Sequence, residues 1–371
     1  MFLHLPPASR DLGTAGLTAD LQRIVLPAVT ESHGEPLFRE LMAIGLGRLR
    51  SFRLVTGRPP YAGLLPLQEE DAGVFFGRRE ETRSLVDLIE KLAKYREKRM
   101  VLLIGPSGSG KSSLLRAGII PQFRQRPGWK VVVPDPLNHE TAMREMDAVP
   151  SNLVVLMGLD QIDEAVTESD GAIFALLRYA VERPQKRCLV IGTLRSESLA
   201  TFNERLGAIS DLIERFVVGP LTRSDYRGII ELPAQAAGGS LDPNLVDALL
   251  ADVASSRVVP DYSQAESRSG SISSDALPLL AVTLRQLWDL RTSASELTLT
   301  TYERIGRFDG AIARTAEAVM AASRLDADDL AQLRRAFLGM VRIDRDGHFS
   351  RRPLRLNEVR GRQPRGASAL R

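Results

Sequence analysis

The sequence predicts an α/β protein with a largely parallel sheet between two layers of helices. Between residues 100 and 219, short apolar runs alternate with helical patterns, which is typical of parallel strands joined by crossover helices. A glycine-rich loop at residues 105–113 joins the first of these runs directly to a helix. Beyond residue 222 the pattern becomes helical, so we expect a second, mainly helical part.

The strands and helices are expected from apolar runs, apolar faces and capping residues. Strands are expected at residues 101–104, 129–133, 153–159, 188–195 and 216–219. Helices are expected at 81–96, 139–146 and 172–181, from a cap at Ser224 to Leu232, from Pro243 onward, and at 277–288, 302–305, 311–322 and 331–337. Residues 337–341 and 347–356 predict a short β wing.

The glycine-rich loop fits the P-loop pattern G-x-x-x-x-G-K-[ST] in full. Its glycines let the backbone curl so that successive N–H groups point at phosphate oxygens. Lys111, expected to face solvent, would reach the β- and γ-phosphates, and the Ser112 hydroxyl would ligate Mg²⁺. The predicted nucleotide-binding residues are Gly105, Pro106, Ser107, Gly108, Ser109, Gly110, Lys111, Ser112 and Ser113.

Two later strands end in residues suited to the same ligand. The run 153–159 ends in Asp160, whose carboxylate is expected to hold the Mg²⁺ shell opposite Ser112. The run 188–195 ends in Arg195, and open α/β sheets bind ligands at the carboxyl ends of their strands. Arg195 is therefore a candidate γ-phosphate sensor, the alternative being a surface arginine that starts the next loop.

The residue that positions an attacking water is expected just after Asp160. Gln161 cannot be a general base, because its amide takes up no proton near neutral pH, although it could orient a water. The carboxylates within reach are Asp163 and Glu164, and we favour Glu164 because its side chain is longer. The alternative is that both cap the following loop and that hydrolysis is negligible.

Composition places the chain among ordinary soluble proteins expected in the cytoplasm. It has 44% hydrophobic and 26% charged residues and a single cysteine, which excludes an internal disulfide framework. No apolar stretch approaches the ~18 residues of a membrane span, and the N-terminus does not resemble a signal peptide. The net charge of +3 does not argue for nucleic acid by itself.

The two ends of the chain predict little chemistry. Residues 1–58 form an extension with a helical apolar stripe from Leu37 to Phe52, which we interpret as core packing. The Ser-rich stretch 255–275 predicts a loop. Residues 341–371 hold nine arginines against three acidic residues, which indicates a solvated or disordered tail or, as the sharper alternative, a polyanion-binding patch.

Taken together, these motifs resemble the STAND class of P-loop NTPases, specifically the bacterial novel STAND NTPase type, from about residue 61 to about 356. The resemblance rests on their order along the chain: residues 61–67, 75–78, the P-loop 105–113, 160–164, 193–195, 218–221, 276–280 and 297–299. It implies a P-loop NTPase three-layer parallel sheet of the AAA+/STAND-like type, a helical lid and a winged-helix-like module. The domains are then expected at 1–58 (extension), 59–222 (NTPase core), 223–300 (lid), 301–357 (winged-helix-like module) and 358–371 (basic tail).

The resemblance also implies roles for single residues. Gly77 and Arg78 would lie by the adenine and ribose, Arg195 would be the sensor arginine, and Pro278 would bring the lid onto the nucleotide. Two features depart from the family. The stretch 133–153 is shorter than expected, and the chain has neither an effector domain nor a C-terminal repeat sensor. A stand-alone switch, one part of a split system and a truncated gene product all fit.

The leading functional hypothesis is therefore an ATP/ADP signalling switch with slow hydrolysis and Mg²⁺ as cofactor. The resemblance implies a homo-oligomer in the ATP state and a separate effector or sensor protein as possible partner. One alternative is a nucleotide-binding adaptor without hydrolysis, which Gln161 after Asp160 supports. The other is a DNA-binding transcriptional regulator that uses the winged-helix-like segment and the basic tail.

Overall fold

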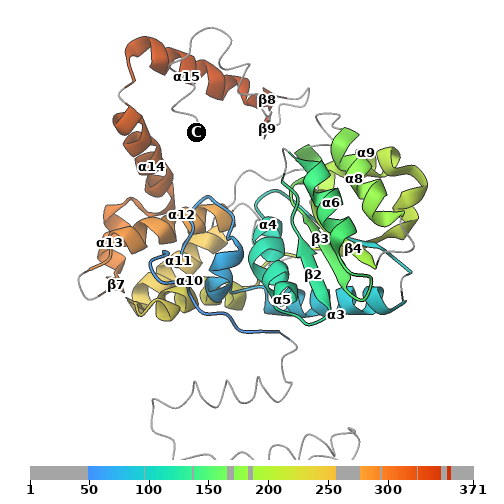
Figure 1. Ribbon diagram of the computed structural model, residues 1–371. Helices are drawn as coiled ribbons and strands as arrows, with labels where there is room; N and C mark the ends of the chain where they lie inside the picture. Colours follow the sequence, from blue (N-terminus) through green and yellow to red (C-terminus); the bar gives the residue numbers. More distant parts are fainter. Residues whose placement is uncertain are drawn as a thin grey trace, which may run out of the picture. The chain divides into compact units, whose positions relative to one another are not determined.

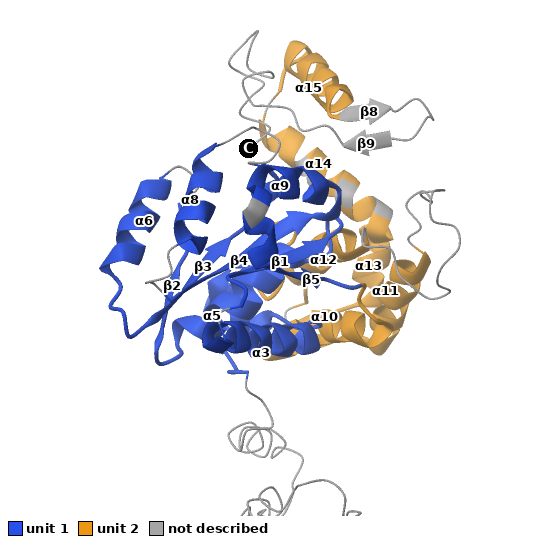
Figure 2. Ribbon diagram, turned by 90° about the vertical axis from the view of Figure 1, so that its right-hand side faces the viewer, with its two compact units in different colours: residues 1–58, 67–219 blue, residues 59–66, 220–371 orange. Residues whose placement is uncertain are grey.

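The computed structural model describes residues 49–95, 97–135, 138–164, 171–182, 187–255, 276–292, 295–323, 325–343 and 349–351. By contacts, the chain forms two compact units: Met1–Arg58 with Leu67–Gly219, and Pro59–Pro66 with Pro220–Arg371 (Figure 2). Three predicted segments lie wholly or mostly outside the described residues: the apolar stripe up to residue 48, the Ser-rich loop from residue 256 and the basic tail.

The first unit contains a five-stranded, fully parallel sheet, which confirms the predicted α/β class with a parallel sheet (Figure 1). The strand order is β2-β3-β4-β1-β5, so the P-loop strand β1 lies between β4 and β5. In register, Gly105 at the end of β1 is opposite Arg195 at the end of β4. The strands are β1 (Met100–Gly105), β2 (Trp129–Val132), β3 (Val154–Leu159), β4 (Cys188–Arg195) and β5 (Ile213–Val217), the last beginning three residues before the predicted run 216–219.

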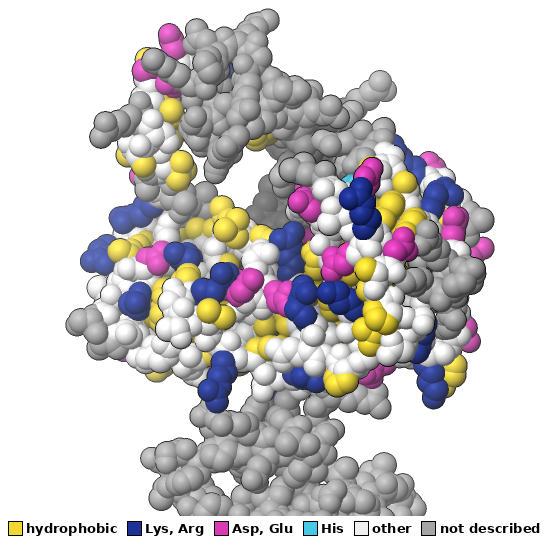
Figure 3. Space-filling model, viewed as in Figure 1, with side chains coloured by type: hydrophobic (Ala, Val, Ile, Leu, Met, Phe, Trp, Pro, Cys, Tyr) yellow, Lys and Arg dark blue, Asp and Glu magenta, His cyan; other side chains and the backbone are white. Residues whose placement is uncertain are grey.

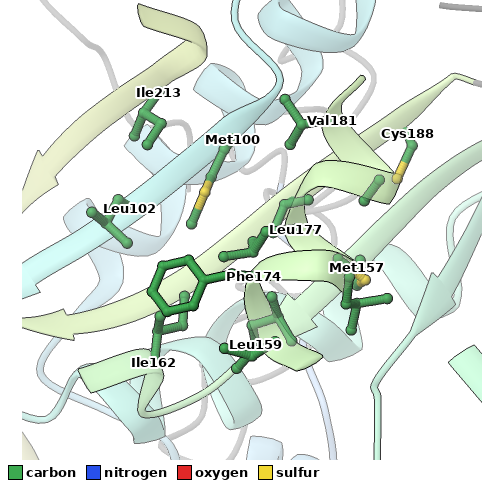
Figure 4. Packing of buried hydrophobic residues seen from close by; sticks show 14 of the residues in the cluster. Met100, Leu102, Met157, Leu159, Ile162, Phe174, Leu177, Val181, Cys188 and Ile213 are labelled. Atoms are coloured by element: carbon green, nitrogen blue, oxygen red, sulfur yellow. The ribbon is translucent and has the colours of Figure 1, made fainter. Parts of the chain in front are cut away.

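Helices cover both faces of this sheet, as the alternation of strand and helix predicts. Figure 2 shows α3 (Arg79–Tyr95) and α5 (Ile120–Arg124) on one face, and α6 (His139–Ala148), α8 (Gly171–Val181) and α9 (Leu199–Leu206) on the other. Side chains alternate along β1 between two hydrophobic clusters. Val101 and Leu103 belong to the first cluster, which includes residues of α3. Met100, Leu102 and Ile104 belong to the second cluster, which includes residues of α6, α8 and α9. In the second cluster, Figure 4 shows Phe174 and Leu177 among residues from the sheet.

The helix that follows the P-loop changes its winding within three turns. It begins as α4 (Lys111–Ser113), continues as a π-helical segment over Leu114–Ile119, and becomes α5. Pro121 has no N–H to donate to the preceding turn, and the π segment lies just before it. A Cβ at Gly118 would lie 2.7 Å from the Phe75 ring, so any other residue at position 118 would force the ring or the helix to move.

The second unit is mainly helical. Its helices are α10 (Arg223–Ala236), α11 (Pro243–Ser255), α12 (Ala276–Asp289), α13 (Leu299–Arg304), α14 (Arg307–Ser323) and α15 (Ala327–Gly339). Two short pairs of strands complete it: β6 (Ser240–Leu241) with β7 (Glu296–Leu297), and the antiparallel β8 (Val341–Ile343) with β9 (Phe349–Arg351). β9 falls within the predicted wing run 347–356, but the run 337–341 is wrong as a strand, because residues 337–339 end α15 and β8 begins only at Val341. The described residues do not show a winged-helix module.

The start of α10 differs from the prediction for a physical reason. Thr222, and not Ser224, is the N-cap, because its hydroxyl accepts from the Asp225 N–H while the Asp225 carboxylate accepts from the Thr222 N–H. This reciprocal capping box starts the helix one residue before Ser224. Among the described helices, none has the combination of length and hydropathy that a bilayer span requires.

Tyr61 explains why residues 59–66 belong to the second unit, although the predicted boundaries place them in the NTPase core. Its ring is buried and packs edge-on against Trp288, with 6.2 Å between ring centroids. The Tyr61 hydroxyl donates to the Ile230 carbonyl in α10, and the Arg285 side chain donates to the backbone carbonyl of Tyr61. Tyr61 is thus part of the hydrophobic core of the helical unit.

We predict that Tyr61→Ala lowers the free energy of unfolding of the second unit by about 3–5 kcal/mol, because a large buried ring is removed. Tyr61→Phe keeps the ring and loses one hydrogen bond, which costs about 1 kcal/mol. The measurement is urea unfolding followed by Trp288 fluorescence in a Trp129→Phe background, since the chain has only these two tryptophans. Equal losses in the two variants would contradict a packing role for the ring.

Candidate functional site

Lys111 is wrapped by the P-loop. Its Nζ donates to the carbonyls of Gly105 at 2.8 Å and Pro106 at 2.7 Å, with Ser109 Oγ at 3.4 Å. The residue is only 8% exposed, so the expectation that it faces solvent is wrong. The loop closes around the ammonium because Gly108 and Gly110 adopt left-handed backbone conformations with φ of 77° and 85°.

The surroundings of Lys111 fit an anionic ligand. Burial lowers the pKa of Lys111 below its ordinary value, while the negative charges of Asp163 and Glu197 act in the opposite direction. Within the described chain, its hydrogen bonds go to neutral oxygens and not to a carboxylate. A buried cation with neutral partners is stabilised by a negative charge, which a phosphate at this loop would supply.

Asp160 follows β3 directly and meets Ser112, as the sequence predicts. Its Oδ1 accepts from Ser112 Oγ at 2.9 Å and from Thr193 Oγ1 at 2.5 Å. Hydroxyl and carboxylate oxygens are the ligands that Mg²⁺ prefers, so this pair fits the predicted metal. Thr193 belongs to the motif 193–195 but was given no role in the site, although its hydroxyl among the buried residues of β4 is a signal that could have found one.

Gln161 holds a strained backbone beside this carboxylate. Its φ is 56°, a left-handed conformation that costs a residue other than glycine about 1 kcal/mol or more. Its N–H donates to Thr193 Oγ1 at 2.7 Å and to Asp160 Oδ1 at 3.0 Å, which stabilises the turn. The turn therefore fixes the direction in which the chain leaves β3.

The two carboxylates that follow have different environments. Asp163 is buried and forms an ion pair with Arg195, with 3.0 Å between its Oδ2 and Arg195 Nε. Glu164 is exposed to solvent. Arg195 lies beside Gly105 across the β1–β4 register, so the structure brings Arg195 and Asp163 to the edge of the sheet that carries the P-loop.

Arg78 supports the P-loop from within the first unit. It is 4% exposed and donates to the Ser109 carbonyl at 3.0 Å and to the Gly219 carbonyl at 2.7 Å. Gly77, just before it, has a φ of 81°. The roles predicted for Gly77 and Arg78 at the adenine and ribose stay predictions, as does that of Pro278, which lies in α12 of the second unit.

Arg116, in the helix that follows the P-loop, also binds Asp160. Arg116 Nε donates to Asp160 Oδ2 at 2.8 Å, and its Nη1 donates to Gln68 Oε1 at 3.0 Å. Its Nη2 forms an ion pair with the same Asp160 oxygen at 2.8 Å. Sequence reasoning missed both residues. A lone arginine among the apolar residues of the P-loop helix is the only local signal for Arg116.

Comparison with known families identifies the chain. Residues 60–370 match the model described as Novel STAND NTPase 1. The protein belongs to this family. A search among curated proteins found no match. This STAND NTPase is accordingly a P-loop protein of a nucleotide-binding family, in agreement with the resemblance inferred from its motifs.

The chain is also similar to solved structures. The ORC1 protein of Aeropyrum pernix, determined in complex with DNA, is 18% identical with a TM-score of 0.50, over 80% of this chain and 78% of that one. The Aeropyrum pernix ORC2 protein, determined as ADPNP–ADP complexes, is 14% identical with a TM-score of 0.46, over 79% and 80% of the two chains. At 18% identity, the similarity to ORC1 establishes a shared fold and nothing finer.

We predict that Lys111→Ala weakens ADP binding by about 10- to 100-fold, because one charge-assisted contact of about 1.5–3 kcal/mol is lost. Isothermal titration calorimetry measures the affinity. Lys130→Ala is the matched control, since Lys130 pairs with Glu145 at the surface of the same unit. Wild-type affinity in Lys111→Ala would remove this lysine from the phosphate site.

Proposed function

We propose that this STAND NTPase is an ATP-binding signalling switch that hydrolyses ATP slowly and assembles into a homo-oligomer in its ATP state. The observation that carries the proposal is the Ser112–Asp160 bond beside the buried ammonium of Lys111. These three side chains provide a cation for the phosphates and two oxygens for a metal ion. The P-loop, residues 105–113, supplies backbone N–H groups around them.

Ser112 and Asp160 would hold Mg²⁺, and the bound ion would neutralise charge on the β- and γ-phosphate oxygens. Lys111 would exchange part of its hydrogen bonding to the loop carbonyls for phosphate oxygens. In this proposal Gly77 and Arg78 lie near the base and ribose, and Pro278 brings the helical lid to the nucleotide.

Arg195 is proposed as the residue that distinguishes ATP from ADP. It stands at the end of β4 beside Gly105, and its present anionic partner is Asp163. A γ-phosphate offers it a second anion that ADP lacks. A ligand can shift a two-state equilibrium only through such a difference in contacts between the states.

Arg195→Ala is expected to abolish the change of oligomeric state while keeping ADP affinity near that of wild type. Light scattering measures the mass in ADP, in a non-hydrolysable ATP analogue and without nucleotide. Wild type should gain mass only with the ATP analogue, whereas Arg195→Ala should not. Arg178→Ala is the control, because Arg178 lies on the exposed side of α8. An equal loss of affinity for both nucleotides would place Arg195 away from the γ-phosphate.

For the attacking water, the environments of the two acidic residues support Asp163. Sequence reasoning favours Glu164 for its longer side chain. Asp163 is buried beside Arg195 and is the carboxylate with the largest electrostatic effect on Lys111, whereas Glu164 is exposed. A carboxylate that orients a water acts best where bulk solvent is excluded.

We predict that Asp163→Asn lowers single-turnover ATP hydrolysis by at least about 100-fold, the usual contribution of a positioned acid–base group. Glu164→Gln, the matched amide substitution one residue later, should change the rate little. The opposite pattern would assign the role to Glu164. Absence of turnover in the wild-type protein would instead support an adaptor that binds nucleotide without hydrolysis.

The DNA-binding alternative gains no support from the described residues. Figure 3 shows acidic and basic side chains side by side over the described part of the face in view. The basic tail at 358–371 lies outside the described residues. A separate effector or sensor protein remains the partner that a switch of this kind would act on.

A further inference from the structure

The Asp160 carboxylate is saturated with donors. Its Oδ1 accepts from the hydroxyls of Ser112 and Thr193 and from the Gln161 N–H. Its Oδ2 accepts from Arg116 Nε at 2.8 Å and forms an ion pair with Arg116 Nη2 at 2.8 Å. These four hydrogen bonds match the roughly four lone-pair sites that a carboxylate offers. Any further group that needs Asp160 must replace one of them.

Arg116 is the donor most suited to leave. Its side chain is 35% exposed, against 10% for Asp160, and it binds the oxygen that Ser112 does not use. It is also the only one of these four donors that carries a charge. A guanidinium on Oδ2 repels a second cation at the same carboxylate, and this repulsion falls away once Arg116 has moved.

Gln68 holds Arg116 in place. Its Oε1 accepts from Arg116 Nη1 at 3.0 Å, while its N–H donates to Asp71 Oδ2 at 2.8 Å. Asp71 is itself held by Arg58 through two bonds of 2.7 and 3.0 Å. Gln68, whose side-chain amide accepts from Arg116, is therefore tied through its backbone to an Asp71 carboxylate that Arg58 also binds.

We propose that Arg116 is an internal cation that competes with Mg²⁺ for Asp160, with Gln68 setting the strength of its hold. Arg116 is then a positioning residue that acts through Asp160 and lowers the metal affinity of the nucleotide complex. This inference rests on the proposed function, since it concerns the metal that accompanies ATP or ADP. It assigns a role to two residues outside the P-loop motif and the acidic motif 160–164.

The test is a Mn²⁺ titration of the full chain with saturating ADP, in which electron paramagnetic resonance measures free Mn²⁺. Arg116→Met, which keeps the bulk and removes the charge, should tighten Mn²⁺ binding by about tenfold or more. Arg116→Lys keeps a cation and should remain closer to wild type. Gln68→Met removes the side-chain oxygen that accepts from Arg116 and should tighten binding by a smaller factor than Arg116→Met.

Arg124→Met is the matched control. Arg124 lies in α5, eight residues along the chain from Arg116, and pairs with Glu69, the neighbour of Gln68, without a bond to Asp160. It should bind Mn²⁺ like wild type. Thermal unfolding of each variant checks the fold, and Gln68→Met carries the test if Arg116→Met does not fold.

Unchanged or weaker Mn²⁺ binding in Arg116→Met would overturn the inference, because the guanidinium would then coexist with the metal at Asp160. Calorimetry of ADP binding without metal, on the same samples, separates this outcome from a failure of the proposed function. A wild-type protein that binds no ADP would contradict the proposed function itself.

Discussion

The hydrogen bonds to the Asp160 carboxylate are the interactions on which the site depends. They join the end of β3 to the P-loop helix through Ser112 and to β4 through Thr193. Because β4 lies between β1 and β3 in the sheet, the P-loop and Asp160 are not on neighbouring strands. The Thr193 hydroxyl, supplied by the strand between them, fills that gap. The strand order thus determines which side chain completes the site.

The three cations of the site have partners within the protein. Lys111 is bonded to loop carbonyls, Arg116 to Asp160, and Arg195 to Asp163. A nucleotide therefore exchanges partners with groups already in place. Such exchange limits the desolvation that binding would otherwise require, since the cations are partly removed from water at the outset. When a ligand displaces one member of the Arg116–Asp160 or Arg195–Asp163 pair, the other member needs a new partner.

Sequence reasoning located the residues that local chain pattern specifies. The P-loop, Asp160 and Arg195 lie at the ends of buried strands, and the apolar runs placed the strands of the five-stranded sheet to within three residues. The burial of Lys111 depends on a loop conformation that two left-handed glycines create, which the motif alone does not reveal. The Arg116–Asp160 pair joins residues 44 apart in sequence, through a π-helical segment that no periodicity predicts. Side-chain contacts of this range depend on packing that one sequence read locally does not contain.

Tyr61 has a consequence for the order in which the chain can fold during synthesis. It precedes Ile230, its partner, by 169 residues, and the whole parallel sheet is encoded between them. At ribosomal rates of about 5–20 residues per second, roughly 10–30 s pass before α10 emerges. The last strand of the sheet ends at Val217, so the sheet can form in that interval. The Tyr61 ring has no partner from α10 until then and stays exposed to solvent. When the helical unit folds, its core must therefore bury Tyr61, a residue synthesised before every strand of the parallel sheet.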